Sequence, residues 1–266
     1  MKSLYDAPDY YAMMFDARRD DVAFYRSLAD SASRERCRPV RVIEYGAGNG
    51  RISLALAAAG HAVLAVENAP AMLRAFRERL SREPESTRRH VTLVEADALD
   101  LSLGERNDLL ICPFNGLAHF ETHAALTRFF DRVHEHLEVH GRFAFDVWLP
   151  NVSVLAGAQS RSPWLDDPRG DGRVRCIERF SYDPLAQVLT ASLEIRDEQG
   201  GLRDELVTRL RQFFPQETLS LLAQHGFTVT HRTTRFDEPH ERASNQFDST
   251  GVPGEMIAYV CVSNNA

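Results

Sequence analysis

Three glycines at alternate positions, Gly46, Gly48 and Gly50, directly follow the apolar stretch 40–43, and the helical pattern of 52–60 comes next. This order predicts a buried strand, a tight turn and a helix. Glycine accepts unusual φ values and lets the backbone lie against a ligand, while the free N–H groups of the helix point into the turn. The stretch is therefore expected to bind a cofactor.

Glu67 ends a second strand-like run, 62–66, and lies 21 residues after Gly46. A carboxylate at such a strand end can accept both ribose hydroxyls of an adenosine cofactor. A solvated strand-end carboxylate is the alternative, and the preceding glycine turn favours the ribose. Asn68 is expected to cap the helix that Pro70 begins.

The spacing of the glycines distinguishes between two kinds of adenosine cofactor. A dinucleotide site has its third glycine three residues after the second, and that position is Arg51 here. Glu44, two residues before the first glycine, is costly to bury unless it meets a cation or several N–H donors. A cofactor with a sulfonium and an α-amino group explains this carboxylate better than one with a pyrophosphate.

Strand-like and helical patterns alternate along most of the chain. The expected strands are 40–43, 62–66, 90–94, 108–112, 142–148, 227–233 and 256–262. The expected helices that follow the first are 70–80, 124–137 and 215–225, with Gly141 and Gly226 ending the last two. This repetition predicts an α/β fold, a Rossmann-like, doubly wound and mostly parallel sheet of seven strands.

The pattern changes after Pro150. Three extended runs, 174–182, 187–196 and 204–213, are separated by turn signals and predict an antiparallel meander inserted after the fifth strand, covering the cofactor side of the sheet. The chain is thus expected to have four parts: an N-terminal helical or lid segment, 1–36, a cofactor-binding core, 37–150, the β insertion, 151–213, and the completion of the core sheet, 214–266.

The composition limits the classes of function. The 266 residues include 31 basic and 38 acidic ones, and the net charge of −7 argues against a surface for nucleic acid or an anionic membrane. The four cysteines are expected to be buried free thiols, and no metal is expected, because nothing completes the spacing of His134, His136 and His140. Without a signal peptide or a membrane-length apolar run, a cytoplasmic protein is predicted, and the oligomeric state, a homodimer included, is left open.

The sequence resembles class I S-adenosylmethionine-dependent methyltransferases at three places, which are the stretch 44–51, Glu67 with 69–73, and 95–97. The resemblance covers roughly residues 38 to 148 and implies S-adenosylmethionine as the cofactor. The glycines would approach its methionine part with Glu44 ordering the turn, Glu67 would bind the ribose, although Asp is commoner there, and Asp97 would meet the adenine. The implied cofactor-binding residues are Glu44, Gly46, Ala47, Gly48, Gly50, Glu67, Asn68, Asp97, Ala98 and Pro113.

The second half narrows the resemblance. Four segments are similar to small-molecule N-methyltransferases of the amino-sugar dimethyltransferase and glycine methyltransferase kind: 112–119, 145–148, 182–184 and 211–215. The resemblance implies a small-molecule acceptor, methylated at an amine nitrogen by in-line transfer.

Three residues are candidates for catalysis. His119, after the fourth strand, titrates near neutrality and is the first candidate for a general base, against the alternative that it caps or packs the next helix. Asp146, at the end of the fifth strand, would orient an amine or serve as a structural carboxylate. Tyr11 is the third candidate, in an aromatic cluster that forms either a lid or part of the core.

Other functions stay open at this point. An O-methyltransferase of a small hydroxylated metabolite and a non-catalytic cofactor-binding partner protein are the alternatives. A nucleic-acid or protein methyltransferase is disfavoured, because the turn after the fourth strand reads Cys-Pro-Phe-Asn and not the Asn/Asp-Pro-Pro-Tyr/Phe of enzymes that act on planar nitrogens.

Overall fold

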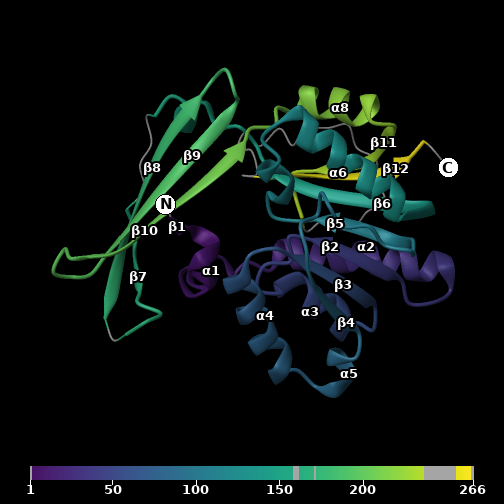
Figure 1. Cartoon of the computed structure of the whole chain (residues 1–266), viewed down its shortest axis with the longest axis horizontal. Coiled ribbons are helices and arrows are strands. Elements are labelled where there is room, and N and C mark those ends of the chain that lie inside the picture. The colour runs from purple at the N-terminus through teal and green to yellow at the C-terminus, as the bar shows by residue number, and fades with distance from the viewer. Residues whose placement is uncertain (1, 158–161, 171, 237–255, 265–266) are drawn as a thin grey trace.

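The computed structural model describes residues 2–157, 162–170, 172–236 and 256–264. Two β-sheets lie side by side, and helices cover both faces of the larger one (Figure 1). Residues 158–161 and 171 of the predicted insertion, and 237–255 and 265–266 of the predicted C-terminal part, lie outside the described residues.

The larger sheet has seven strands in the order β11-β12-β6-β5-β2-β3-β4. Their bounds are β2 Arg41–Tyr45, β3 Ala62–Glu67, β4 Val91–Glu95, β5 Asn107–Cys112, β6 Leu137–Trp148, β11 Phe227–Thr233 and β12 Met256–Ser263. The pairs from β4 to β6 are parallel, while β12 runs antiparallel to both β6 and β11. The predicted doubly wound, mostly parallel sheet is confirmed.

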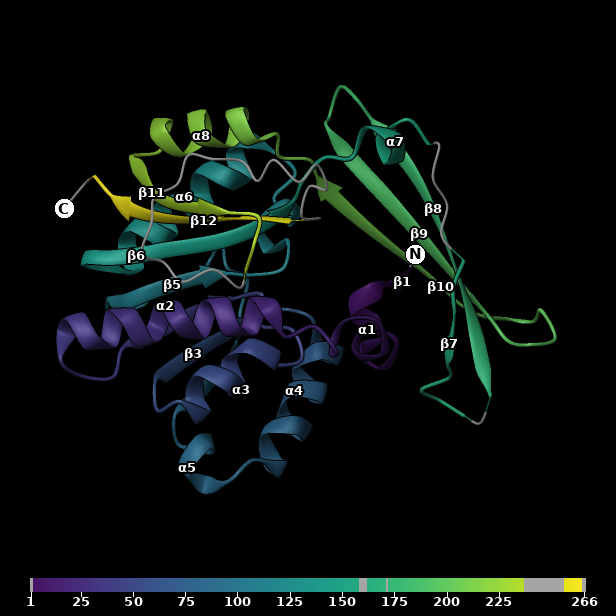
Figure 2. The same ribbon diagram turned by 180° about the vertical axis from the view of Figure 1, so that it is seen from behind.

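Alternate residues of the strands enter two cores, one on each face of this sheet. The helices α2 Asp20–Arg36, α3 Arg51–Ala58 and α4 Pro70–Arg82 pack on one face, and α6 His123–His136 and α8 Pro215–Gln224 pack on the other (Figure 2). Within β2, Ile43 enters the core beneath α6, whereas Val42 enters the core beneath α2 and α3. Such buried central strands explain the apolar runs in the sequence.

The smaller sheet contains the predicted meander and two further strands. Its order is β1-β10-β9-β8-β7, with β1 Lys2–Ser3, β7 Trp164–Asp166, β8 Arg173–Asp183, β9 Val188–Arg196 and β10 Leu202–Arg211. The strand β1 pairs with β10, so the N-terminal segment joins the insertion. The short elements η1 Leu4–Asp6 and α1 Pro8–Phe15 follow β1, and α1 lies between the two sheets (Figure 1). The short helices α5 Glu85–Arg88, η2 Gly116–His119 and α7 Val152–Leu155 complete the described elements.

Three local predictions are wrong. Asn68 does not cap α4: Ala69 is the N-cap residue, and the Glu67 carboxylate accepts from the N–H groups of both. Gly141 does not end α6, which stops at His136, and β6 begins at once with an irregularity in its pairing to β5. Of the four free cysteines, Cys37 is exposed; it is the C-cap residue of α2, in the left-handed conformation at φ 53°.

Gly50 is the glycine whose replacement the fold tolerates least. It precedes α3 at φ +85°, and a Cβ there would lie 2.3 Å from the Phe76 ring, whereas Gly60, at φ +92°, has open space around it. We expect Gly50→Ala to lower the free energy of unfolding by about 2–5 kcal/mol, and the control Gly60→Ala by about 1–2 kcal/mol. Urea unfolding measures both, and equal losses would contradict the contact with Phe76.

Candidate active site

The glycine turn between β2 and α3 faces open space. Gly46 and Gly48 have φ values of +70° and +58°, and a Cβ added to either would meet no atom within 4 Å. Both residues line a cavity of about 260 Å³, here called the turn cavity. The backbone of the turn is therefore accessible to a ligand, as the glycine pattern predicts.

The carboxyl ends of the parallel strands bring most of the predicted cofactor-binding residues to this cavity. Those that line it are Gly46, Gly48, Glu67, Asn68, Asp97, Ala98 and Pro113. Glu44, Ala47 and Gly50 do not line it. Glu44 is buried at the end of β2 and accepts a hydrogen bond from the Ser53 hydroxyl of α3. Burial raises the pKa of Glu44 to about 8, while the hydrogen bond from Ser53 and the positive charge of Arg51 oppose this shift.

Glu67 ties the glycine turn to the beginning of α4. One carboxylate oxygen accepts the Gly48 N–H at 2.7 Å, and the other accepts the N–H groups of Asn68 at 3.0 Å and Ala69 at 2.7 Å. Burial raises the pKa of Glu67, while these three donors oppose that shift. The side chain thus lies at the cavity wall with its orientation fixed.

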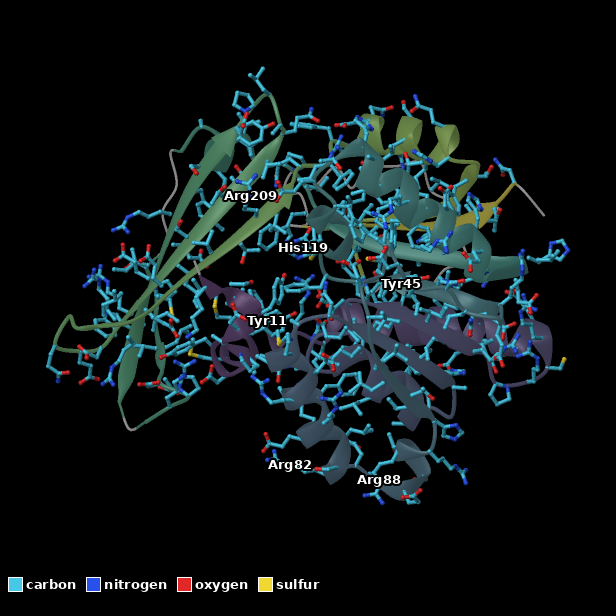
Figure 3. All side chains as sticks on the ribbon, in the orientation of Figure 1. Tyr11, Tyr45, Arg82, Arg88, His119 and Arg209 are labelled. Carbon is cyan, nitrogen blue, oxygen red and sulfur yellow. The ribbon has the colours of Figure 1, made fainter. Side chains whose placement is uncertain are left out.

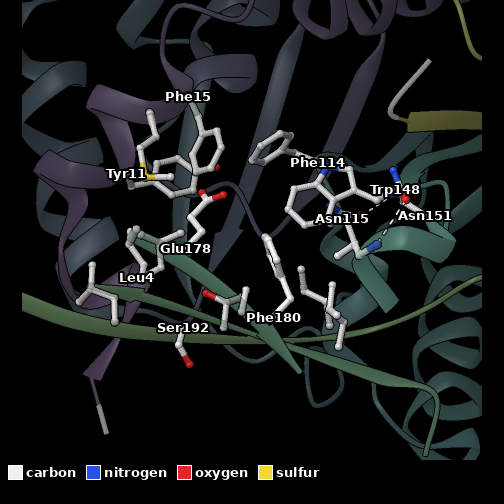
Figure 4. Close-up of a pocket in the computed structure, with 18 of the residues that line it drawn as sticks. Leu4, Tyr11, Phe15, Phe114, Asn115, Trp148, Asn151, Glu178, Phe180 and Ser192 are labelled. Atoms are coloured by element: carbon white, nitrogen blue, oxygen red, sulfur yellow. Dashed lines mark hydrogen bonds between the residues drawn. The ribbon is translucent and has the colours of Figure 1, made fainter. Parts of the chain in front are cut away.

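A second cavity, of about 470 Å³, lies between α1 and the inner face of the smaller sheet; it is here called the sheet cavity (Figure 4). Tyr5, Tyr11 and Phe114 line both cavities. Tyr11 packs edge-on against Phe114, with ring centroids 6.3 Å apart. These three aromatic residues mark the place where the two cavities meet.

His119 and Tyr5 form a pair at this junction. The Tyr5 hydroxyl lies 2.7 Å from His119 Nε2, and His119 lines the turn cavity at the end of η2. Although the ring is accessible from the cavity, the surrounding protein lowers the pKa of His119 to about 4. Burial raises the pKa of Tyr5, so both groups are neutral at pH 7. His119 and Tyr11 lie where the two sheets face each other (Figure 3).

Asp146 lines neither of these two cavities. Its carboxylate is fully buried and accepts from the Tyr25 hydroxyl and from the Phe114 N–H at 3.0 Å. Burial raises its pKa to about 6. Its carbonyl accepts the Asn115 N–H at 3.1 Å, so Asp146 holds the segment that carries Phe114 and Asn115.

Charged pairs attach the N-terminal segment to the glycine turn. Arg51 donates to both carboxylate oxygens of Asp21 at 2.6 Å, and both side chains are buried. Asp16 accepts from Asn49 Nδ2 at 3.0 Å and from Arg79 at 2.8 Å. The segment that bears Tyr5 and Tyr11 is therefore held against the turn.

Two of the three histidines with metal-like spacing have other partners. His136 lies 2.7 Å from the Tyr45 hydroxyl, and His134 contacts Ser263 and the His225 carbonyl. Among the described residues, no group of three His, Cys, Asp or Glu side chains could hold a metal ion. In the same part of the chain, no helix is long and apolar enough to cross a membrane.

Comparison with known proteins relates part of the chain to a known family. Residues 42–141 match the family described as a methyltransferase domain. A search of curated proteins finds no match. Residues 42–141 thus form a methyltransferase domain.

Solved structures of methyltransferases share the whole fold. CcbJ, a methyltransferase from Streptomyces caelestis, is 24% identical with a TM-score of 0.78, and 98% of each chain is covered. CalS10 from Micromonospora echinaspora, an amino pentose methyltransferase involved in calicheamicin biosynthesis and solved with bound S-adenosylmethionine, is 20% identical with a TM-score of 0.64, covering 88% of this chain and 87% of CalS10. The glycopeptide N-methyltransferase MtfA, complexed with S-adenosylmethionine, is 23% identical with a TM-score of 0.57, covering 90% and 93%. The chain has the fold of S-adenosylmethionine-dependent methyltransferases, which confirms the predicted fold and agrees with the predicted class and cofactor.

The lowered pKa of His119 gives a direct test of its surroundings. We expect its imidazole to stay neutral as the pH falls and to titrate near 4, whereas the unfolded chain takes up the proton near 6.5. His119 then makes the folded state progressively less stable as the pH falls through this interval, because the unfolded state binds the proton first. NMR titration of the ring protons measures the midpoint, His119→Gln identifies the signal, and a midpoint near 6.5 would contradict the expectation.

Proposed function

We propose that this methyltransferase transfers a methyl group from S-adenosylmethionine to an amine nitrogen of a small molecule by in-line displacement. The meeting of the two cavities at Tyr5, Tyr11 and Phe114 carries this proposal. The turn cavity has the residues for the cofactor, and the sheet cavity has room for an acceptor. The methyl group and the acceptor nitrogen would approach each other at the junction.

The turn cavity fits the cofactor residue by residue. The open backbone at Gly46 and Gly48 would contact the methionine part, and Glu67 at the wall would accept from the ribose hydroxyls. Asp97 and Ala98 line the part that would hold the adenine. When bound, S-adenosylmethionine supplies an electrophilic methyl group on its sulfonium, so alignment is the protein's main contribution.

His119 would take the proton that the acceptor nitrogen loses. A neutral His119 can accept the Tyr5 hydroxyl proton at Nε2, which leaves the Tyr5 oxygen able to accept a proton at the junction. The proton of the acceptor would thus pass to Tyr5 while the Tyr5 proton passes to His119. Tyr11, on the wall of both cavities, would align the acceptor.

A small amine is the acceptor that the sheet cavity supports. Its volume of about 470 Å³ is that of a small-molecule pocket, and its lining is mainly aromatic and aliphatic. CalS10 is an amino pentose methyltransferase and MtfA is a glycopeptide N-methyltransferase, which supports nitrogen as the methylated atom. A cytoplasmic location and a homodimer remain predictions.

The cofactor part of the proposal is tested by calorimetric titration with S-adenosylmethionine and with NAD. We expect binding of S-adenosylmethionine only, and Glu67→Ala should weaken it about tenfold or more, because hydrogen bonds to the ribose are lost. Glu95→Ala is the matched control, since Glu95 ends the neighbouring strand β4 but does not line the turn cavity. Binding of NAD and not of S-adenosylmethionine would refute the proposal.

The catalytic part is tested by methyl transfer to amines, amino sugars and phenols, detected as a mass shift. With an amine acceptor found in this way, His119→Ala should lower turnover about 100-fold near neutral pH while cofactor affinity stays almost unchanged. His123→Ala, an exposed histidine at the beginning of α6, is the control. If turnover of His119→Ala equals that of the control, His119 has only a packing role.

A further inference from the structure

The strand β10 presents a hydroxyl to the sheet cavity between two buried leucines. Leu206 and Leu210 are buried, and both line the cavity. Thr208 lies between them on the same face, because the pairing of β10 with β9 is regular over residues 204–211 and side chains alternate along a strand. Thr208 is only half-buried and lines the same cavity, so the exposed part of its side chain faces this space.

The neighbours of Thr208 across the sheet leave room beside its hydroxyl. Thr208 pairs in register with Ala191 of β9, and Ala191 pairs with Phe180 of β8. All three residues line the cavity. Ala191 is small, whereas Phe180 extends from the sheet into the cavity (Figure 4). A ligand can therefore lay an apolar body against the Phe180 ring while a polar group reaches Thr208.

The residue before Thr208 connects this position to the N-terminal segment. Val207 pairs with Ser3 of β1. The pairing is parallel, so the next residues of the chain, Leu4 and Tyr5, continue in the direction of Thr208. Both line the sheet cavity, and Tyr5 belongs to the junction with the turn cavity.

The residue after Thr208 connects it to the other side of the junction. Arg209 donates to the two carboxylate oxygens of Glu121 at 2.9 and 2.8 Å. Glu121 follows His119 by two residues, and His119 Nε2 lies 2.7 Å from the Tyr5 hydroxyl. Thr208 is thus held between the two segments that supply the pair at which the proton of the acceptor would be taken up.

The hydroxyl, and not the shape of the side chain, distinguishes Thr208 from the residues beside it. Valine has nearly the same shape as threonine, and both residues are common in strands. A threonine hydroxyl can donate one hydrogen bond and accept two, so a hydroxyl group of a ligand can both donate to it and accept from it.

We propose that Thr208 determines specificity by binding a hydroxyl group of the acceptor, which selects amino alcohols whose hydroxyl is close to the amine nitrogen. This inference rests on the proposed function in assigning the sheet cavity to the acceptor. With the nitrogen at the junction, the hydroxyl would lie at Thr208 and the apolar body would contact Phe180. Thr208 takes part in recognition and orientation, and the proton transfer at the junction does not involve it.

The test compares two probes that differ by a hydroxyl group, 2-amino-1-phenylethanol and phenethylamine, by calorimetric titration of the full chain near neutral pH. We expect the wild type to bind the better enantiomer of the amino alcohol about three- to tenfold more tightly than phenethylamine, as a hydrogen bond between neutral groups provides. Thr208→Val should remove this preference by weakening binding of the amino alcohol and leaving that of phenethylamine unchanged. Thr190→Val is the matched control and should keep the preference, because Thr190 lies on β9 with the opposite parity and does not line the cavity.

Equal affinity of the wild type for both probes, no binding of the amino alcohol, or an unchanged preference in Thr208→Val would overturn the proposal. Circular dichroism checks the fold of each variant. If Thr208→Val does not fold, Thr208→Ala and Thr208→Ser decide: the first should lose the preference and the second should keep it, and any other pair of results would overturn the proposal. Since these titrations need neither cofactor nor methyl transfer, their outcome is separate from that of the proposed function.

Discussion

The buried ion pair between Arg51 and Asp21 fixes the position of the N-terminal segment, and both cavities depend on that position. The guanidinium meets both carboxylate oxygens at 2.6 Å, and Asp21 is fully buried. Such a pair offsets its cost of desolvation only with this bidentate geometry, and removal of either partner would leave a buried charge. Because Arg51 is the first residue of α3, the pair joins α2 to the end of the glycine turn.

The same pair gives a physical reason for the departure from the dinucleotide pattern. There, a glycine lets the helix pack closely on the strand; here, the residue at that position extends its side chain toward α2. Asp16 continues the attachment by contacting Asn49 in the turn and Arg79 on α4. The N-terminal segment is therefore held against the turn by side chains of the turn, of α3 and of α4.

Sequence periodicity was sufficient for the core sheet and for one side of the site. Parallel strands end at the same edge of a sheet, so residues at the ends of β2, β3, β4 and β5 had to lie together, as Gly48, Glu67 and Asp97 do.

Contacts between distant segments could not be predicted in this way. Tyr5 lies 114 residues from His119, and only the aromatic cluster near the N-terminus hinted at it. Asp146 was placed at the correct strand end, and its side chain lies in the core beside Tyr25; the position at a strand end did not decide between the two roles considered for it. Asn68 does not cap α4, because the longer Glu67 side chain accepts the N–H groups at the beginning of this helix.

Each of the two sheets forms the wall of one of the two cavities. The strand ends of the larger sheet hold the turn cavity, whose shape depends on glycine conformations and on buried carboxylates that tolerate little change. The inner face of the smaller sheet packs with the N-terminal segment in a core of its own, around Tyr10, Cys176 and Leu206, separate from the two cores of the larger sheet. The smaller sheet also contacts the larger one through β10, where Arg209 donates to the Glu121 carboxylate and Leu210 enters the core beneath α6. The N-terminal segment is paired with β10 at Lys2–Ser3 and fastened to α3 at Asp21, so it transmits the position of one cavity to the other. The residues that belong to both walls, Tyr5, Tyr11 and Phe114, are therefore the ones whose placement is constrained from both sides.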